Sequence, residues 1–310
     1  MKISFLISTF NGQDDIVLLL DSIAALEIPS GTIEVIIRDD NSSDTTVDII
    51  KKHYRWVTLI EGKETLGFVK SNNVAFQFAT GDIICCVNQD TILDASFLRE
   101  STALFEKYSE VVALNTNMIM PWIMSLDEWR SIPMENMPAY VYSLTIFGYI
   151  AYKRIAPVVQ DGNFVSGGGA FIRRKAIGPE EDLFDAEISM YCEDTELSLR
   201  LSKRGRIIVS PQTGLYHNQV PKKIGSFNQF VKMTRITWNR FYVLAKHYTT
   251  LKFFACYPLF LIGIVLKNNH LGLTSVKKWV AYLASVGLVV PFFFLFPVWL
   301  IKNIQMKWLK

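Results

Sequence analysis

The stretch Asp82-Ile83-Ile84-Cys85-Cys86-Val87-Asn88-Gln89-Asp90 decides the fold. Its apolar part has the length of a short buried strand, and the polar side chains of Asn88 and Asp90 follow where that strand ends. Two earlier apolar runs end in the same way, at Thr9-Phe10-Asn11 and at Asp39-Asp40-Asn41-Ser42-Ser43-Asp44. Three such endings predict one sheet edge that carries all three polar clusters.

Strands and helices are predicted to alternate along most of the chain. The predicted strands are residues 2–8, 33–38, 56–60, 82–88, 111–116, 169–173 and 206–210. The predicted helices are residues 12–26, 43–54, 67–79, 94–108 and 193–203. This alternation predicts an α/β fold with a Rossmann-like, mostly parallel sheet and helices on both faces.

Residues 117–161 break this rhythm, because they are rich in Met, Trp, Tyr and Pro and carry few helix signals. We interpret them as an insertion over the ligand-binding edge. The alternative is additional core packing that is unrelated to a ligand.

Composition limits the class of protein. Half of the 310 residues are hydrophobic, and the net charge of +3 is too small to indicate a nucleic-acid partner. The four cysteines lack metal-ligand spacing, and adjacent Cys85 and Cys86 would point to opposite faces of a strand. We therefore expect buried thiols in a reducing compartment. Residues 1–8 read as a strand rather than a signal peptide, which predicts a catalytic part in the cytoplasm.

The apolar excess lies near the end of the sequence. Residues 279–301 are 23 uncharged residues with lysines on both sides, enough to span a bilayer. Residues 253–266 are 14 uncharged residues, which would either span or lie in the interface. The basic and aromatic segment 229–252 suits an anionic membrane surface. We expect a membrane-associated helical tail at 249–310, and the alternative is a buried helix pair.

The clusters near the first two strand ends suit a nucleotide. A carboxylate of Asp39 or Asp40 can accept hydrogen bonds from a base or a ribose, and Phe10 offers a flat face. The alternative is an Asx turn and helix cap. Asp90 can coordinate a hard divalent cation, with Asn88 as a neutral ligand or as a neighbour of the ligands. The alternative there is a plain turn.

Three further motifs follow in the second half of the chain. Ser166-Gly167-Gly168-Gly169-Ala170 has no P-loop lysine, and it suits either close backbone approach to a ligand or a tight turn. Glu193-Asp194 opens a predicted helix, either as a general base or as N-terminal carboxylates. His217 follows the last predicted strand and is either structural or in contact with a metal or diphosphate.

In this order, the motifs resemble those of an inverting family 2 glycosyltransferase with the GT-A fold, of a rhamnosyltransferase-like kind. The resemblance covers residues 1–248, which it implies are the catalytic domain. The matching segments are residues 8–11, 39–44, 66–68, 72–73, 88–91, 167–169, 184–185, 193–194 and 217.

The resemblance implies a role for each matching residue. Phe10 and Asp40 would hold the nucleobase, with Asp39 near the ribose. Asn88-Gln89-Asp90 corresponds to the family's DxD motif, with Asp90 and His217 on a Mg²⁺ or Mn²⁺ ion. The implied catalytic residues are Asp194, as general base, and Glu193. The implied donor-binding residues are Thr9, Phe10, Asn11, Asp39, Asp40, Asn88, Gln89, Asp90, Gly167, Gly168 and Gly169.

Two departures from the family pattern refine this expectation. Asn88 replaces the first DxD carboxylate, as in rhamnosyltransferase-like members. This replacement points to a deoxysugar donor and, because it lowers the charge of the site, to weaker binding of a metal. The Gln-x-x-Arg-Trp motif of processive synthases is absent. Residues 237–242 instead resemble a helix of lipid-linked glycan transferases, which favours transfer of a single sugar.

The resemblance therefore implies transfer from a dTDP- or UDP-sugar to a lipid-linked glycan, with inversion. This would occur in bacterial surface polysaccharide synthesis, at the cytoplasmic face of the cell membrane. An alternative is a catalytically inactive membrane scaffold or glycan-binding protein of the same fold. A nicotinamide-dependent oxidoreductase is disfavoured, because residues 8–13 do not supply its glycine fingerprint.

Overall fold

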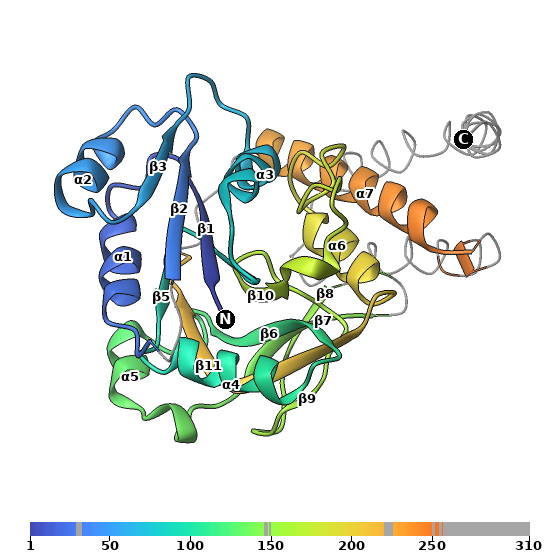
Figure 1. The fold of residues 1–310 in the computed structure, drawn as a ribbon. Coiled ribbons are helices and arrows are strands. Elements are labelled where there is room, and N and C mark those ends of the chain that lie inside the picture. The colour runs from blue at the N-terminus through green and yellow to red at the C-terminus, as the bar shows by residue number, and fades with distance from the viewer. Residues whose placement is uncertain are drawn as a thin grey trace. The chain divides into compact units, whose positions relative to one another are not determined.

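The computed structural model in Figure 1 describes residues 1–28, 33–145, 148, 150–219, 226–249, 252, 253 and 256. The chain divides into two compact units, Met1–Lys222 and Lys223–Lys310. The sequence analysis places the division after residue 248 instead. The helix α7 (Ser226–His247) accounts for most of the described part of the second unit.

The first unit is built on a nine-stranded sheet among the described residues, in the order β3-β2-β1-β4-β10-β6-β11-β5, with β9 paired to β11. The strands of this sheet are β1 (Ile3–Thr9), β2 (Ile33–Asp39), β3 (Thr58–Glu61), β4 (Ile83–Val87), β5 (Thr91–Leu93), β6 (Val111–Ile119), β9 (Gln160–Asp161), β10 (Gly169–Arg173) and β11 (Arg206–His217). A separate antiparallel hairpin consists of β7 (Tyr140–Leu144) and β8 (Ile150–Arg154).

Helices cover both faces of the sheet, as predicted. The helices of the first unit are α1 (Ile16–Ala24), α2 (Thr46–His53), α3 (Phe68–Phe78), α4 (Phe97–Lys107), α5 (Leu126–Ser131) and α6 (Glu193–Leu201), with 3₁₀ turns η1 (Met134–Asn136) and η2 (Arg174–Ala176). Apolar side chains of α1, α2 and α4 share one core cluster with Cys85. Those of α3 and α6 share a second cluster with Cys86. The two thiols are therefore free and lie on opposite faces of β4.

The prediction of a mostly parallel sheet is wrong in the second half of the sheet. Strands β1 to β4 pair in parallel, and so do β6 and β11. Strand β10, however, lies antiparallel between β4 and β6, and β5 and β9 lie antiparallel to β11. The chain leaves β6 and enters β10 at the same sheet edge, without the crossover helix that a parallel connection needs. The sheet is therefore mixed.

The segment 117–161 contains both core packing and a separate hairpin, and its place over a ligand stays a prediction. Its first part packs in a small core cluster at the sheet edge, where Met124, Trp129 and Met137 surround Tyr216. A helix, α5, forms here because the Ser125 hydroxyl accepts a hydrogen bond from the Glu128 N–H at 3.2 Å. This Ser-x-x-Glu capping signal is visible in the sequence, although residues 117–161 carry few other helix signals. The second part of the segment forms the β7–β8 hairpin.

Of the predicted tail 249–310, the structure describes only Thr249, Lys252, Phe253 and Cys256, so both apolar stretches lie almost wholly outside the described residues. In the part of the chain that the structure describes, no helix has both the length and the apolar character needed to cross a membrane.

The mutation Gly169→Ala should destabilise the first unit. An added Cβ would lie 2.1 Å from Leu215 Cδ2 and 3.0 Å from Thr116 Oγ1, and Leu215 is fully buried. Overpacking of this kind typically lowers the free energy of unfolding by about 1–3 kcal/mol. Urea unfolding measures the loss. The same mutation in a Leu215→Ala background should cost less, and an equal cost in both backgrounds would exclude the clash as its cause.

Candidate active site

The loops after β1, β2 and β4 meet at one edge of the sheet. Strands β1 and β2 are in register up to Thr9 and Asp39, and β4 pairs with β1 on its other side. The loops are tied by hydrogen bonds from Asn11 N to Ser42 Oγ and from Ser43 N to Asn11 Oδ1, both 2.9 Å. Asn11 has a φ of +47°, a left-handed conformation that asparagine tolerates. The predicted clusters therefore do lie together.

The carboxylate of Asp40 faces protein donors rather than solvent. It pairs with the Arg38 guanidinium and accepts hydrogen bonds from Leu66 N at 2.7 Å, Gly67 N at 2.8 Å and Ser71 Oγ at 2.9 Å. These bonds fasten the loop between β3 and α3 to the end of β2. The contact of Asp40 with a nucleobase stays a prediction.

The other residues predicted to bind a nucleoside differ in exposure. Asp39 is buried and accepts hydrogen bonds from Ser42 N at 2.9 Å and Ser42 Oγ at 2.5 Å. Phe10 is 47% exposed, so one face of its ring is accessible to a ligand. Thr9 is buried and donates its hydroxyl proton to Gln89 Oε1 at 2.8 Å.

Asn88, Asp90 and His217 lie side by side at the same edge. His217 is the last residue of β11 and pairs with Thr91 of β5, which places its ring beside the loop after β4. Its Nε2 lies 3.0 Å from Asp90 Oδ1 and 3.4 Å from Asn88 Nδ2. Asn88 Oδ1 and His217 Nδ1 are buried and have no hydrogen-bond partner within the described residues.

A divalent cation fits this group of side chains. One carboxylate, one imidazole nitrogen and an unpartnered amide oxygen are ligand types that Mg²⁺ or Mn²⁺ accepts. Across the described part of the chain, no three His, Cys, Asp or Glu side chains come together as a metal site. Any cation here would therefore take several ligands from its substrate or from water.

The glycine segment passes between two candidate groups. A Cβ on Gly167 would lie 2.8 Å from Asp194 Oδ1, and a Cβ on Gly168 would lie 2.9 Å from Asn88 Nδ2. The N–H of Gly167 donates to Asp194 Oδ1 at 2.8 Å. This N–H therefore holds the candidate base, and close approach of the segment to a ligand stays a prediction.

Asp194 lies in the first turn of α6, after an unusual turn. Tyr191 and Cys192 both have left-handed backbones, with φ of +68° and +73°. Such residues cost about 1–3 kcal/mol each and cluster at functional sites. Burial raises the pKa of Asp194, and the Gly167 N–H opposes this. Burial and the neighbouring Asp194 charge raise the pKa of Glu193, whose buried Oε2 has no hydrogen-bond partner among the residues that the structure describes.

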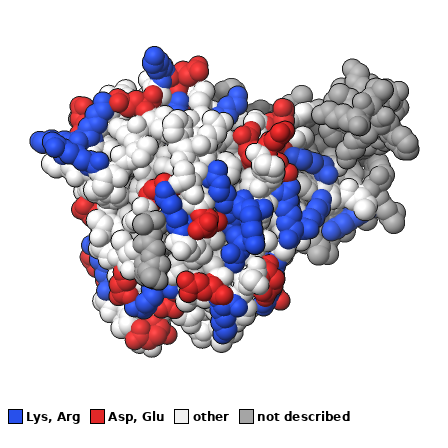
Figure 2. Space-filling view, viewed as in Figure 1, with Lys and Arg blue, Asp and Glu red and all other residues white. Residues whose placement is uncertain are grey.

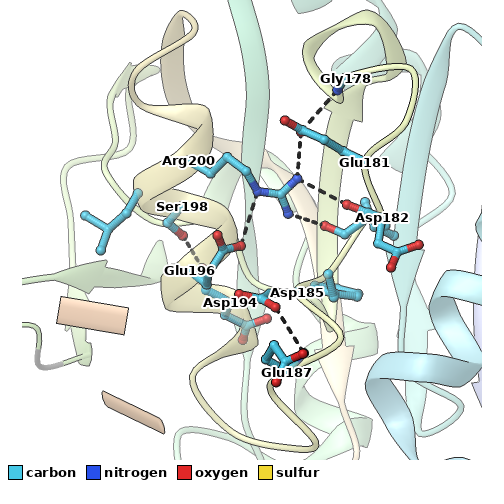
Figure 3. Close-up of polar contacts among 12 residues, drawn as sticks. Gly178, Glu181, Asp182, Asp185, Glu187, Asp194, Glu196, Ser198 and Arg200 are labelled. Carbon is cyan, nitrogen blue, oxygen red and sulfur yellow. Dashed lines mark hydrogen bonds and ion pairs between the residues drawn. The ribbon is translucent and has the colours of Figure 1, made fainter. Parts of the chain in front are cut away.

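Arg200 fixes α6 to the segment that precedes Phe184, as Figure 3 shows. Its guanidinium contacts Glu196 at 3.2 Å and Glu181 at 3.1 Å, and it donates to the Leu183 carbonyl at 2.7 Å. Glu196 is fully buried on the same helix and orients the guanidinium, and the contacts with Glu181 and Leu183 hold the helix against that segment. The spacing of four residues between Glu196 and Arg200 could have revealed the pair in the sequence.

The β7–β8 hairpin reaches the region of the candidate base. The Tyr142 carbonyl accepts a hydrogen bond from Asn115 Nδ2 at 3.3 Å, and Asn115 Oδ1 accepts one from Ser166 N at 3.4 Å. Burial raises the pKa of Tyr142, and the charge of Asp194 raises it further. Tyr142 was not predicted, because no local pattern indicates that the inserted segment folds back to residue 194.

Aromatic rings extend from Tyr142 along the hairpin. The Tyr142 ring lies 4.9 Å from that of Tyr152, which stacks on Tyr140 at 5.5 Å and meets Trp122 edge-on at 6.3 Å. Trp122 is 56% exposed. The Tyr152 hydroxyl donates to the Met118 carbonyl at 2.6 Å, which anchors the rings at the end of β6.

A cavity of about 660 Å³ lies away from these residues. It is lined by the start of β1 and β4 and by the end of β10, including Met1, Asp82 and Arg174. Those strand ends form the opposite edge of the sheet. Figure 2 shows Lys and Arg side chains gathered on the face in view, close to where β10 and α6 lie in Figure 1. None of the candidate site residues lines this cavity.

Comparison with known proteins gives one family match and several relatives. The family model for glycosyl transferase family 2 matches residues 4–178, more than half of the chain. The poly(ribitol-phosphate) β-N-acetylglucosaminyltransferase TarS of Staphylococcus aureus is 31% identical over 117 residues, 37% of this chain and 20% of the relative. The poly-β-1,6-N-acetyl-D-glucosamine synthase of Staphylococcus epidermidis is 30% identical over 226 residues, 72% of this chain and 51% of the relative. The chain thus spans a fifth to about half of these relatives.

Two solved structures share the fold. A crystal structure of a TarS fragment has a TM-score of 0.64 at 17% identity and covers 93% of this chain and 79% of that chain. The mannosyltransferase PcManGT of Pyrobaculum calidifontis, in complex with GDP-Man and Mn²⁺, has a TM-score of 0.57 at 17% identity, with 99% and 80% covered. The first unit thus has a GT-A-like α/β fold with a mixed sheet, and the chain belongs to glycosyl transferase family 2.

Proposed function

We propose that this chain transfers one sugar from a nucleotide-diphosphate sugar to an acceptor hydroxyl, with inversion at the anomeric carbon. The observation that carries the proposal is the arrangement around the glycine segment. Asp194 lies against Gly167, and Asn88 lies against Gly168. A candidate base and a candidate diphosphate-binding group thus flank one stretch of backbone, as a reaction between two bound substrates requires.

The donor would lie along the edge formed by the loops after β1, β2 and β4. Its base would stack on the exposed face of Phe10, and its diphosphate would lie near Asn88, Asp90 and His217. A divalent cation held there would supply positive charge to the departing diphosphate. The Mn²⁺ in the PcManGT structure supports this choice of cation. The TarS name supports an N-acetylglucosamine donor, whereas Asn88 in the DxD position supports a deoxysugar.

Asp194 would act as the general base. The acceptor oxygen would attack the anomeric carbon while its proton passes to Asp194 and the bond to the diphosphate breaks. The raised pKa of Asp194 makes it a stronger base than an exposed aspartate. The same raised pKa means that Asp194 is still protonated at a pH at which an exposed aspartate is ionised. The Gly167 N–H fixes one carboxylate oxygen, which leaves the other for the acceptor.

The acceptor would be a lipid-linked glycan of a bacterial surface polysaccharide, reached at the cytoplasmic face of the membrane. The surface polymers named in the two relatives support a polymeric glycan or polyol phosphate. The β7–β8 hairpin supports an acceptor side formed by the inserted segment, because Asn115 links the Tyr142 carbonyl to the N–H of Ser166, next to Gly167. Membrane attachment through residues 249–310 rests on the sequence of that tail.

The pH dependence of transfer tests the role of Asp194. A base must be ionised to act, so kcat/KM should rise with pH through an apparent pKa above the ~4 of an exposed aspartate. Asp194→Asn should lower kcat by roughly 10²–10⁴-fold and leave donor binding intact. Rates with a panel of dTDP-, UDP- and GDP-sugars supply the measurement. The Glu193→Gln variant should show the same rise of kcat/KM with pH as the wild type. Near-normal turnover by Asp194→Asn would disprove the assignment.

Two alanine substitutions in the glycine segment should have separable effects. Gly167→Ala should displace the Asp194 carboxylate and lower kcat by ~10-fold or more at unchanged donor affinity. Gly168→Ala should instead displace Asn88 and weaken donor binding. Gly162→Ala is the matched control, because its Cβ would approach Val209 Cγ2 at 2.8 Å, away from these groups. Identical effects of the first two variants would contradict separate roles.

Loss of the Trp122 ring should weaken acceptor binding only. Trp122→Ala is expected to raise the acceptor KM by roughly 3- to 10-fold, the size of one aromatic contact, at unchanged donor hydrolysis. Suitable acceptors are a β-1,6-linked N-acetylglucosamine oligosaccharide and poly(ribitol phosphate). Trp56→Ala is the control, since Trp56 is 47% exposed and meets Tyr54 edge-on at 6.2 Å. Equal acceptor KM values for the two variants would exclude the Trp122 ring from the acceptor side.

A further inference from the structure

The side chain of Gln89 turns away from its neighbours Asn88 and Asp90. Its Oε1 accepts hydrogen bonds from Thr9 Oγ1 at 2.8 Å and from Phe10 N at 2.9 Å. Its Nε2 lies 3.4 Å from the Phe10 carbonyl, to which it donates. One amide group therefore engages both backbone polar groups of Phe10.

The position of this amide is enclosed by the loop after β1. A Cβ on Gly12 would lie 2.6 Å from Gln89 Oε1 and 3.0 Å from Nε2, so the amide packs on bare backbone. Thr9, whose hydroxyl also bonds Oε1, is fully buried in β1. Gln89 therefore lies in a fixed contact rather than in open solvent, and its acceptor oxygen is already used by the protein.

This contact joins two parts of the proposed donor site. Phe10 offers the face for the nucleobase, whereas Asn88 and Asp90 lie with His217 where the diphosphate would bind. The two loops follow β1 and β4, which are neighbours in the sheet but lie about 80 residues apart in the sequence. A shift of the loop after β4 is therefore transmitted directly to the backbone of Phe10.

We propose that Gln89 is a positioning residue that couples binding of the nucleobase to binding of the diphosphate. The inference rests on the proposed function, and it reassigns Gln89 from direct donor contact to the alignment of Phe10. When a ligand group orders one loop, the entropy cost of ordering the other loop becomes smaller. Binding of either ligand group therefore strengthens binding of the other. The ligand class selected in this way is an intact nucleoside diphosphate, in preference to a nucleoside or a diphosphate alone.

A double-mutant cycle on nucleotide binding tests this coupling without relying on transfer. The affinities of UDP, dTDP and GDP with Mn²⁺ are measured by calorimetry for the wild type, Phe10→Ala, Asp90→Asn and the double variant. The cycle uses the nucleotide that the wild type binds most tightly. Coupled residues are expected to depart from additivity, here by ~3-fold or more in Kd. The same cycle in a Gln89→Ala background should be additive.

Two variants separate coupling from damage to the fold. Gln89→Glu keeps an acceptor for Thr9 Oγ1 and Phe10 N and should retain most of the non-additivity. Gln77→Ala is the matched control, because Gln77 is an exposed residue of α3 and should leave the cycle unchanged. Thermal melts verify that each variant is folded.

The outcomes are distinct. Non-additivity that persists undiminished in folded Gln89→Ala overturns the inference and leaves the proposed function standing. Its loss in Gln89→Glu as well as in Gln89→Ala also counts against the hydrogen-bonding role. Failure of the wild type to bind any of the three nucleotides overturns the proposed function, and the inference with it.

Discussion

The backbone of Gly167 and Gly168 is the constraint on which the site depends. Asp194 Oδ1 approaches this backbone from one direction and Asn88 Nδ2 from another, each closer than a Cβ would allow. The segment can enter there because β10 lies antiparallel between β4 and β6, starting opposite Val87 at the end of β4. The antiparallel strand is thus the feature that brings the second half of the chain to the edge that carries the candidate site.

The surroundings of Asp194 combine several energetically unfavourable features. Two carboxylates adjoin at the start of α6, burial raises the pKa of both, and the preceding turn holds two left-handed residues. Arg200, on the same helix, binds buried Glu196 and the carbonyl of Leu183. Buried ion pairs contribute little net stability, but the loss of one partner is costly. The Arg200 contacts therefore serve mainly to keep the helix in one position.

The sequence predicted the parts of the fold that depend on local pattern. Strands β1, β2, β4 and β10 lie within a residue or two of their predicted ranges, because buried strands read as apolar runs bounded by polar residues. The convergence of the three polar clusters also followed from the sequence, since carboxyl ends of parallel strands share an edge. The approach of His217 to Asp90 agrees with the position expected from the family motif.

The missed features depend on contacts between distant parts of the chain. No local pattern reveals that β10 runs antiparallel, that Asn115 links Tyr142 to Ser166, or that Gln89 binds Phe10. The direction of the Asp40 carboxylate likewise depends on the Leu66 and Gly67 N–H groups, about 26 residues away. Side-chain direction at a loop requires the three-dimensional neighbours of that loop, which composition and periodicity do not supply.

A crystal structure of the Asp194→Asn protein with its nucleotide sugar and Mn²⁺ is the most direct test of this account. We expect the base against Phe10, the diphosphate and Mn²⁺ between Asn88, Asp90 and His217, and the anomeric carbon facing residue 194. A nucleotide sugar bound instead in the cavity beside Met1 and Arg174, at the opposite edge of the sheet, would contradict the account.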